Sequence, residues 1–386
     1  MFVFFLSIVP AQAGIFDFVL NPFKDAKIGH WLAGDYAVNI DDADGAVDSC
    51  GLNNLGNTCY MNALLQNLYR AWGPLAYNDN LMAVLHDHGF VDFREARCKI
   101  SKRRAERECV LLVELFNLFR CMSETDRLVM RPKKFLDAFF SVVEVSNVLR
   151  GDFERGGQSD SQQLFEYLAD IFSDFLEYAQ KTSIYNIGLV SCGRCLVCNN
   201  SFRDVQKVQS PNLLVEIGSS TLDGCLDLFF QENFFGIKGN QDNRAFCAAC
   251  SVNQAGTRKV ELQSINQFLH IQLNRFRSNN TGHVVSKITN QVSLPEILDV
   301  KKFISQDSKI KTEYRLVGII FHAGTAKGGH YFAAVKNKTD NNWVLYNDSE
   351  VTVLDMEQVA CMLASGQLSA GVWQGQAYLL CYENLG

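Results

Sequence analysis

The sequence predicts an α+β fold in which the helices come first along the chain and the strands follow. In the first half, apolar residues recur at the three- and four-residue spacing of one helical face. The second half carries short aromatic or β-branched runs bounded by Gly, Asn and Asp, which are typical of strands. The chain has 386 residues, 47% of them hydrophobic, and this is enough for one large globular unit with an ample core.

Three helices are indicated in the first half, and the first of them begins near Cys59. Their apolar faces comprise Met61, Leu64, Leu65, Leu68, Tyr69 and Trp72; Leu112, Leu115, Phe116 and Phe119; and Leu164, Phe165, Leu168, Ile171, Phe172 and Phe175. The basic run at 94–107, interleaved with acids, is interpreted as a solvated loop or helix face in preference to a nuclear signal or an anion site.

Five strands are indicated in the second half. They cover residues 268–276, 314–321, 330–335, 343–346 and 377–382. Because the helices and strands are segregated along the chain, the arrangement favours an α+β protein.

Cys59 has the setting of a nucleophile. It lies in the segment 51–62, which reads Gly-Leu-Asn-Asn-Leu-Gly-Asn-Thr-Cys-Tyr-Met-Asn. Asn57 and Thr58 are residue types that cap helices, so Cys59 is expected in the first helical turn. The helix dipole and unpaired N–H groups there favour a thiolate. The alternative is a buried structural cysteine, because free Cys is among the most buried residue types.

A histidine motif lies far downstream. It reads Gly328-Gly329-His330-Tyr331 and is followed at 343–349 by Trp-Val-Leu-Tyr-Asn-Asp-Ser. Cys, His and Asn or Asp that are distant in sequence but able to meet in space are the pattern of a cysteine hydrolase. His330 is then the base, and the alternative is a satisfied strand histidine.

The chain resembles the catalytic domain of the ubiquitin-specific proteases, the papain-like cysteine proteases that remove ubiquitin. Four blocks carry the resemblance in the family's order: the cysteine segment 51–62; Gln-Ser-Asp-Ser-Gln-Gln-Leu-Phe at 158–165; the stretch 246–250 leading to 269–276; and the histidine motif, which closes with 377–382. Together these blocks run from about residue 50 to residue 384 and so cover nearly all of the chain.

The resemblance implies a papain-like fold with a helical thumb, a β-rich palm and zinc-bearing β fingers. The catalytic domain would cover 50–386, with the fingers at about 186–265. Residues 1–49 would be an N-terminal arm and linker. Within them, residues 1–13 resemble a signal peptide, although no Lys or Arg precedes the apolar run. That run is too short to span a bilayer.

The activity that the resemblance implies is a thiol-dependent deubiquitinase, which hydrolyses the isopeptide or peptide bond after the C-terminal glycine of ubiquitin. Two alternatives stay open: a protease for another ubiquitin-like modifier, and a catalytically inactive ubiquitin-binding scaffold. Intact Cys59, His330 and Asn347 argue against the scaffold.

The family places an Asp or Asn at the position of Asn347, where it orients the imidazole of His330. Adjacent side chains on a strand point to opposite faces, so only one of Asn347 and Asp348 should face His330. The resemblance favours Asn347, whereas chemistry alone favours the carboxylate of Asp348. The oxyanion donors implied are the Cys59 backbone N–H and the Asn54 side chain. The alternative for Asn54 is a turn residue that bonds its own loop.

Two CxxC pairs indicate a structural zinc site with four cysteine ligands, which the resemblance puts at the tip of the fingers. We take the ligands to be Cys192, Cys195, Cys247 and Cys250. Cys198 makes this choice ambiguous, because Cys195-x-x-Cys198 is also a CxxC pair. We prefer Cys192, since Cys198 then falls where relatives can carry a non-ligand cysteine.

Two of the blocks are expected to hold the substrate. In the family, block 158–165 usually carries two acidic residues that hold the basic, extended ubiquitin tail. Asp160 matches the first, but Gln163 stands where a glutamate is common. Gly328 and Gly329 would let the backbone approach a chain that ends in Gly-Gly, with Tyr331 in the same motif. The alternative is that Gln163 is simply an exposed helix residue.

Charge and cysteine content bound the partners and the compartment. A net charge of −6 speaks against nucleic acid as a partner. The resemblance implies ubiquitin and ubiquitinated proteins as partners, and we expect a monomer without a transmembrane segment. The motif needs a free thiol, so we expect a reducing compartment, cytoplasmic or nuclear. A genuine signal peptide would instead indicate an exported effector acting in a host cytosol. Cys109, Cys121 and Cys361 are expected in the core.

Overall fold

The computed structural model describes residues 50–385, except 86, 125–128, 182–183, 185–186, 238–242, 280–283, 307 and 309. The predicted N-terminal arm and possible signal peptide therefore lie outside the described residues. Among the helices of the described part, none is both long enough and apolar enough to cross a membrane.

Most of the helices precede most of the strands, as predicted. The helices are α3 (Cys59–Trp72), α4 (Asp79–Leu85), α5 (His88–Cys98), α6 (Lys102–Glu124), α7 (Lys133–Val143), α8 (Leu149–Asp152), α9 (Ser161–Tyr178), α10 (Leu222–Phe230) and α11 (Met356–Ser365), with 3₁₀ turns η2 (Gly73–Tyr77) and η4 (Lys301–Phe303). The three predicted helical faces fall in α3, α6 and α9, so these helices are confirmed.

The earlier strands, up to residue 264, are short or belong to one long arm. They are β1 (Gly51–Leu52), β2 (Val129–Met130), β3 (Ile187–Cys195), β4 (Ser201–Ser210), β5 (Asn212–Glu216), β6 (Asn233–Phe235), β7 (Ala245–Cys247), β8 (Val252–Gln254) and β9 (Gly256–Ser264).

The later strands include all five predicted strands, and all of them except the separate pair β11–β12 belong to the main sheet. They are β10 (Phe268–Asn274), β11 (Phe276–Ser278), β12 (Val284–Lys287), β13 (Ile297–Asp299), β14 (Glu313–Thr325), β15 (Gly328–Lys336), β16 (Trp343–Asn347), β17 (Glu350–Val353), β18 (Gln367–Ala370) and β19 (Trp373–Asn384).

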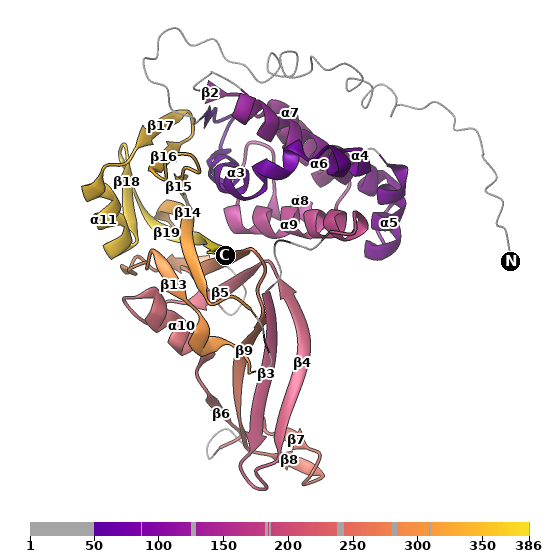
Figure 1. Ribbon diagram of the computed structural model, residues 1–386, viewed down its shortest axis with the longest axis vertical. Helices are drawn as coiled ribbons and strands as arrows, with labels where there is room; N and C mark the ends of the chain where they lie inside the picture. Colours follow the sequence, from indigo (N-terminus) through magenta and orange to yellow (C-terminus); the bar gives the residue numbers. More distant parts are fainter. Residues whose placement is uncertain are drawn as a thin grey trace, which may run out of the picture.

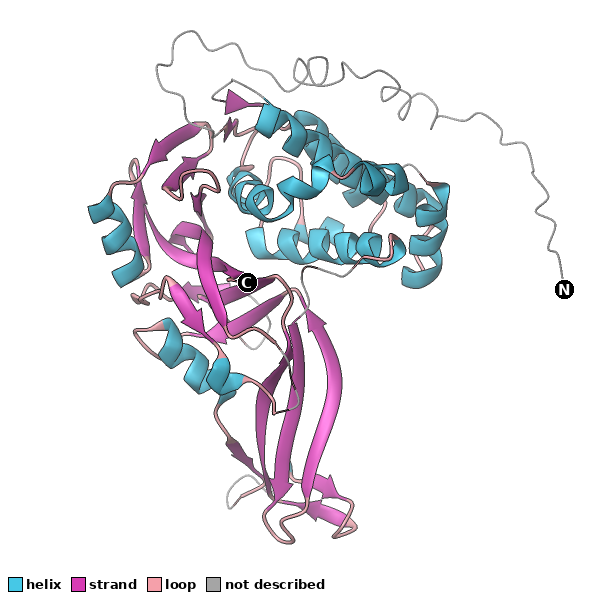
Figure 2. Cartoon of the chain, in the orientation of Figure 1, coloured by secondary structure: helices cyan, strands magenta, loops and turns pink. Residues whose placement is uncertain are grey.

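Three regions are visible in Figure 1: a helical region formed by α3–α9, a central sheet beside it, and a long arm of strands that extends away from both. The central sheet has the order β17-β16-β15-β14-β19-β10-β5, with β13 paired to β14 and β18 to β19. The arm is a four-stranded sheet of order β4-β3-β9-β6, with the small hairpin β7–β8 at its far end (Figure 2). This arrangement corresponds to the expected thumb, palm and fingers.

The central sheet is buried on both faces, because an apolar cluster covers each of them and alternate residues of its strands point into one or the other. On β14, Ile320 packs with the helical region, whereas Ile319 and Phe321 pack with the cluster that includes residues of α10 and α11. The sheet therefore separates two apolar clusters, and this packing fixes the position of its strands relative to α3.

Helix α3 packs on this sheet, against β14, β15 and β16. Met61, Leu65, Leu68 and Trp72 are fully buried along its apolar face. Each such side chain contributes about 1.5–3 kcal/mol by leaving water. The burial fixes the rotation of α3 and hence the position of Cys59 at its first residue.

Arg94 departs from the expectation for the basic run at 94–107. Instead of being solvated, it is 1% exposed and lies between α5, α6 and α9. Its guanidinium bonds Glu108 at 2.8 Å, Asp170 at 2.8 Å and Asp174. Three carboxylates satisfy the buried charge, whose desolvation would otherwise be costly.

Two smaller expectations have different outcomes. Cys109 and Cys121 are buried in the apolar cluster of the helical region, as expected, whereas Cys361 is exposed on α11.

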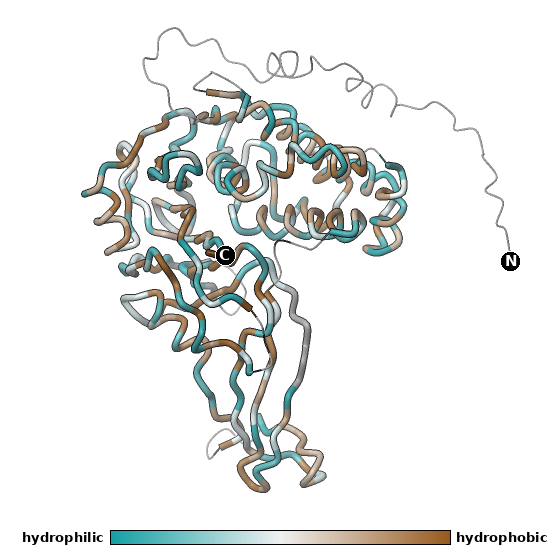
Figure 3. Tube along the Cα trace, viewed as in Figure 1, coloured by the Kyte–Doolittle hydropathy of each residue, from teal (hydrophilic) through white to brown (hydrophobic). Residues whose placement is uncertain are grey.

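Apolar stretches also reach the far end of the fingers (Figure 3), where Val197, Phe246 and Val252 are exposed.

Candidate active site

The segment before Cys59 is held against the hairpin formed by β16 and β17. The backbone N–H of Leu52 donates to the carbonyl of Asp348 at 2.8 Å, and β1 pairs in parallel with β2. A Cβ on Gly51 would lie 2.5 Å from the Ser349 carbonyl oxygen, so only glycine permits this approach. The cysteine segment and the hairpin are thus fixed to each other.

The start of α3 differs from the expected cap. Thr58 occupies the N-cap position, but its side chain makes no cap hydrogen bond and instead accepts from the Leu55 N–H at 2.9 Å. Asn57 adopts a left-handed φ of 54° and donates to the Gly156 carbonyl. Thr58 and Asn57 therefore shape the turn before the helix and do not cap its first N–H groups.

The thiol of Cys59 is buried, and its surroundings act on its pKa in opposite directions. Burial raises the pKa above its ordinary value, and the carboxylate of Asp348 raises it further. Backbone N–H groups of Tyr331 and Tyr60 lower it by donating towards the sulfur. The N–H groups at the start of the helix favour the thiolate, as expected, but burial has the larger effect, and the pKa of the free protein's thiol is raised. Cys59 needs a base.

The imidazole of His330, on β15, is oriented by the side chain of Asn347. Its Nε2 lies 2.6 Å from Oδ1 of Asn347, at the end of β16. The imidazole stacks on Trp373 with ring centroids 5.1 Å apart and an interplanar angle of 24°. The amide fixes one edge of the ring and the indole covers one face. Nδ1 is then the nitrogen left to exchange a proton with a thiol.

Asp348 faces a different set of groups from Asn347. Its carboxylate accepts from Asn54 Nδ2 at 3.0 Å and from Asn62 Nδ2 at 2.8 Å. Asn54 in turn accepts from the backbone N–H groups of Gly56 and Thr58 at 3.1 Å through its Oδ1. Asn347 therefore contacts the histidine, while Asp348 holds the expected oxyanion donor and the turn before the cysteine.

A groove of about 470 Å³ contains Cys59. Its lining includes all five residues expected to bind substrate, namely Asp160, Gln163, Gly328, Gly329 and Tyr331. Segments far apart in sequence thus meet at one surface, between the start of α9, the turn from β14 to β15 and the start of α3.

Asp160 has a larger local role than sequence reasoning assigned to it. It is the N-cap of α9, where its Oδ1 accepts from the Gln162 N–H at 2.7 Å. Its carboxylate also accepts from the hydroxyls of Tyr378, at 2.8 and 2.9 Å, and Tyr331, at 3.2 Å. Burial raises the pKa of this carboxyl, and these hydrogen bonds oppose the rise.

Gly328 and Gly329 are required by the protein itself. A Cβ on Gly329 would lie 1.9 Å from the Ala323 carbonyl oxygen, and one on Gly328 would lie 2.6 Å from Gln158 Oε1. The Gln158 amide both donates to the Gly329 carbonyl and accepts from its N–H, each at 3.2 Å. Gln158 therefore ties the start of α9 to the strand that carries the histidine.

Sequence reasoning missed Gln158, His322 and Trp373. Gln158 opens the second block and could have been found there, whereas Trp373 follows a turn with no motif to indicate it. His322 lines the groove, but burial lowers its pKa to about 3, which keeps it neutral. Its ring lies 4.7 Å from that of Tyr331, and the bond to Asn347 belongs to His330.

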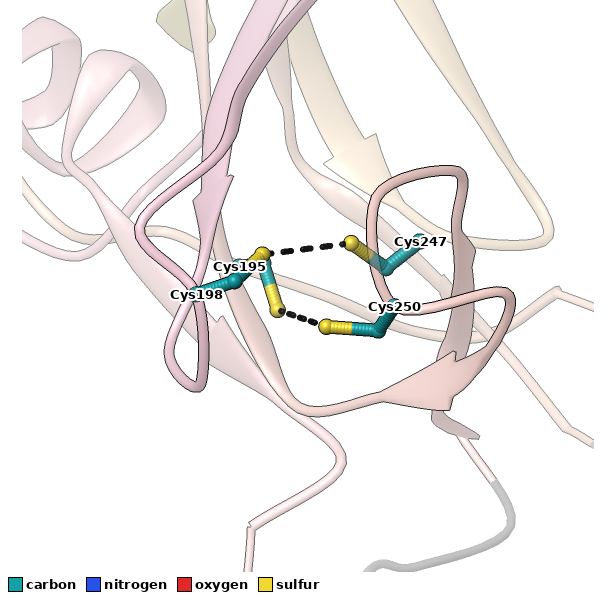
Figure 4. Close-up of side chains that lie close together, drawn as sticks. All are labelled: Cys195, Cys198, Cys247 and Cys250. Atoms are coloured by element: carbon teal, nitrogen blue, oxygen red, sulfur yellow. Dashed lines mark hydrogen bonds between the residues drawn. The ribbon is translucent and has the colours of Figure 1, made fainter.

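The second constellation lies at the tip of the fingers. The thiols of Cys195, Cys198, Cys247 and Cys250 lie within 4.8 Å of one another and could hold a metal ion. The Sγ atoms of Cys195 and Cys250 are 4.0 Å apart, and those of Cys198 and Cys247 are 3.6 Å apart (Figure 4). Backbone N–H groups of Cys198 and Val197 lower the pKa of Cys195 to about 7.

The predicted ligand set needs one correction, because Cys198 takes the place of Cys192. Both Cys192 and Cys195 lie within β3, where residues three apart point to opposite faces. The Sγ of Cys192 instead lies 3.6 Å from a carboxylate oxygen of Glu261. The chain turns after Cys195, and this turn brings the thiol of Cys198 back to the cluster.

Comparison with known proteins agrees with these features. The family model described as ubiquitin carboxyl-terminal hydrolase matches residues 50–382. The zebrafish (Danio rerio) protein ubiquitin carboxyl-terminal hydrolase 48 is 27% identical over 316 residues, which cover 79% of this chain. The chain spans only 27% of the length of that protein.

Two further similarities cover more of the matched protein. Human Ubl carboxyl-terminal hydrolase 18 is 25% identical over 352 residues, covering 87% of this chain and 85% of that protein. A solved structure of the SAGA Ubp8/Sgf11/Sus1/Sgf73 DUB module bound to ubiquitin aldehyde matches with a TM-score of 0.62 and 21% identity, over 88% of this chain and 70% of that one. This similarity confirms the predicted fold.

Proposed function

The chain belongs to the ubiquitin carboxyl-terminal hydrolase family, and on this premise we propose that it is a thiol-dependent deubiquitinase. It would hydrolyse the isopeptide or peptide bond after the C-terminal glycine of ubiquitin. The observation that carries the proposal is the 2.6 Å contact between His330 Nε2 and Asn347 Oδ1. His330 lies on β15, and other residues of this strand line the groove that contains Cys59. Ubiquitin and ubiquitinated proteins are the partners proposed.

In the first half of the reaction, Cys59 attacks the carbonyl carbon at the end of the ubiquitin tail. Its proton passes to His330, because burial keeps the free thiol protonated. The oxyanion accepts from the Cys59 backbone N–H and from Asn54. An amide nitrogen carries two hydrogens, so the bond of Asn54 to Asp348 leaves one for the oxyanion.

In the second half, the C–N bond breaks as the imidazolium of His330 gives its proton to the leaving amine. A thioester to Cys59 remains. Water then loses a proton to His330 as it attacks the thioester, and the C–S bond breaks. The imidazolium of His330 returns its proton to the departing sulfur, which restores the thiol, and the released ubiquitin carboxyl group ionises in solvent. Asn347 stabilises the imidazolium in both halves by accepting from Nε2.

Replacing the nucleophile tests this proposal. We expect Cys59→Ala to lose on the order of 10⁶-fold in turnover of a fluorogenic ubiquitin substrate, since covalent catalysis disappears. Ubiquitin binding, measured by calorimetry, should persist. Retained turnover in Cys59→Ala would contradict the mechanism, and lost binding would indicate a structural role for this cysteine.

A protease for another ubiquitin-like modifier is the second candidate. Two observations favour keeping it: the name of the human relative refers to Ubl, and Gln163 leaves one position of the groove uncharged. Hydrolysis of fluorogenic ubiquitin, SUMO and NEDD8 conjugates, measured side by side, separates the two candidates. A catalytically inactive scaffold would cleave none of the three.

We further propose that the four-thiol cluster holds one structural zinc ion. Four thiolates at about 2.3 Å from zinc have sulfur–sulfur separations of roughly 3.8 Å when tetrahedral. The separations of 3.6 and 4.0 Å fit that geometry. Zinc would tie the knuckle after β3 to the hairpin β7–β8. Freshly purified protein should contain stoichiometric zinc, and its absence from metal analysis would count against the proposal.

We propose that the enzyme acts in the cytoplasm or nucleus, because its chemistry needs a free thiol. We also propose that it is a monomer. Export through residues 1–13, followed by action in a host cytosol, is the alternative. Light scattering of the purified chain tests whether it is a monomer. Fractionation of cells that express a C-terminally tagged chain, with sequencing of its N-terminus, distinguishes the cytoplasm or nucleus from export.

A further inference from the structure

A third side chain extends the hydrogen-bonded pair formed by His330 and Asn347. While Oδ1 of Asn347 faces His330 at 2.6 Å, its Nδ2 donates to Oε2 of Glu350 at 2.9 Å. Both ends of the amide are therefore engaged, one by the imidazole and the other by a carboxylate.

The fold places Glu350 there by strand register. Asn347 and Glu350 are directly paired across the β16–β17 hairpin, with residues 348 and 349 as the turn. The turn is fixed in place, because Asp348 adopts a left-handed φ of 54° and its carboxylate is held by Asn54 and Asn62. The carboxylate of Glu350 therefore stays beside the amide that orients the histidine.

An asparagine needs such a partner, and an aspartate does not. Only Oδ1 of an amide accepts hydrogen bonds, whereas both oxygens of a carboxylate do. The last side-chain torsion of asparagine is broad and roughly two-fold, so a free amide can present Nδ2 to the histidine. That orientation would face the donor Nε2–H of an imidazolium with another donor.

We propose that Glu350 is a positioning residue that holds the amide of Asn347 with Oδ1 towards His330. A carboxylate only accepts, so it favours the orientation in which Nδ2 points to Glu350 and disfavours the reverse. Its effect on turnover rests on the proposed hydrolase function, but its effect on the orientation of His330 does not.

The test combines Glu350→Ala with Asn347→Asp. In the wild-type background, Glu350→Ala should lower kcat for fluorogenic ubiquitin about 3- to 10-fold, as expected for one solvent-accessible, charge-assisted hydrogen bond, with KM and Tm unchanged. In the Asn347→Asp background there is no amide to orient, and Glu350 repels the new carboxylate. Glu350→Ala should then leave kcat unchanged or raise it.

A readout without ubiquitin separates this proposal from the proposed function. Alkylation of Cys59 by chloroacetamide, followed on its own peptide by mass spectrometry, depends on proton transfer to His330 and should slow with kcat. Glu357→Ala is the matched control, because Glu357 is exposed on α11 and carries the same charge. It should change neither rate.

Two results would overturn the proposal: no loss in the wild-type background by either readout, or an equal loss in both backgrounds, which indicates a structural role. If the wild-type protein cleaves no ubiquitin substrate, the hydrolase proposal fails. The alkylation rates of the four proteins, with and without Glu350→Ala in each of the two backgrounds, then decide on Glu350 alone.

Discussion

At the scale of single residues, the chemistry depends on which neighbours face Cys59. The buried thiol has a raised pKa, with burial as the main cause and the carboxylate of Asp348 as an additional one. The same carboxylate holds Asn54, the expected oxyanion donor. Asp348 thus opposes formation of the thiolate while it positions a group that the reaction needs.

This double role predicts opposite effects of Asp348→Asn. Removing the negative charge lowers the pKa of Cys59, so alkylation of the free protein near neutral pH should speed up, by about tenfold if the pKa falls by one unit. Turnover should instead slow, because Asn54 loses its carboxylate partner. Rates of Cys59 alkylation and of ubiquitin hydrolysis measure the two effects.

The matched control is Asp92→Asn, which removes one exposed charge from α5 at the end of the thumb. It should alter neither rate. If Asp348→Asn slowed both reactions, Asp348 would act only by holding the turn, and its charge would not govern the thiol.

A second prediction at this scale concerns the uncharged position in the groove. Gln163 is exposed and lines the groove one helical turn from Asp160. We expect Gln163→Glu to lower KM for ubiquitin substrates several-fold and to steepen the salt dependence of KM, because a charge-assisted contact to a basic tail is added.

Gln267→Glu adds the same charge at an exposed position that does not line the groove, and serves as the control. An unchanged KM for Gln163→Glu at low ionic strength would mean that this helix does not read the tail. Asp160→Ala is a poorer probe, because Asp160 also caps α9 and holds two tyrosines.

At the scale of elements, the fingers show that a strand and the turn after it direct neighbouring cysteines to different partners. Cys192 lies inside β3 and faces Glu261, whereas the turn after Cys195 gathers four thiols from the knuckle and the β7–β8 hairpin. A metal there would join elements that otherwise share few apolar contacts, with Phe246 and Val252 exposed to solvent.

This arrangement predicts different outcomes for two cysteine variants. Cys198→Ser should lower the zinc content and the Tm, because structural zinc contributes directly to folding. Cys192→Ser should keep one zinc ion per chain, since its thiol lies outside the cluster. Metal analysis and thermal unfolding distinguish them, and the reverse pattern would restore Cys192 to the ligand set.

At the scale of the whole molecule, the helical region and the central sheet meet through buried groups that include a histidine. His270 on β10 is 2% exposed, and its ring lies 4.4 Å from that of Phe165 on α9. Burial lowers its pKa to about 3. The interface between thumb and palm therefore requires a neutral imidazole.

Acid should weaken this interface in a defined window. An unfolded histidine binds a proton below about pH 6.5, whereas folded His270 does so only near pH 3. The free energy of unfolding should therefore fall as the pH drops through this range, by at most about 1.4 kcal/mol per pH unit from this group. His270→Gln removes that contribution.

Denaturant unfolding at about pH 7 and about pH 4.5 measures the effect, as the loss of stability on acidification in wild type minus that in His270→Gln. Any metal contribution is common to both proteins and cancels. An equal loss in both would show that His270 does not contribute to acid sensitivity.

Much of the fold follows from local patterns in the sequence. The helical faces of α3, α6 and α9 and the five later strands were predicted, because periodicity is set by neighbours within one element. The class of chemistry was also predictable. A cysteine such as Cys59 at a helix start, a downstream histidine such as His330 and two CxxC pairs rarely occur together outside such a site. Motif order along the chain then indicated one catalytic unit.

The tertiary structure alone decided which groups face one another. Strand register placed Asn347 against His330 and Asp348 against Asn54. Because β3 ends at Cys195, the thiol of Cys198, and not that of Cys192, joins the four-thiol cluster. The tertiary structure also buried Arg94 among three carboxylates and raised the pKa of the Cys59 thiol. Periodicity fixes the direction of a side chain relative to its own element, whereas partners and burial depend on segments hundreds of residues away.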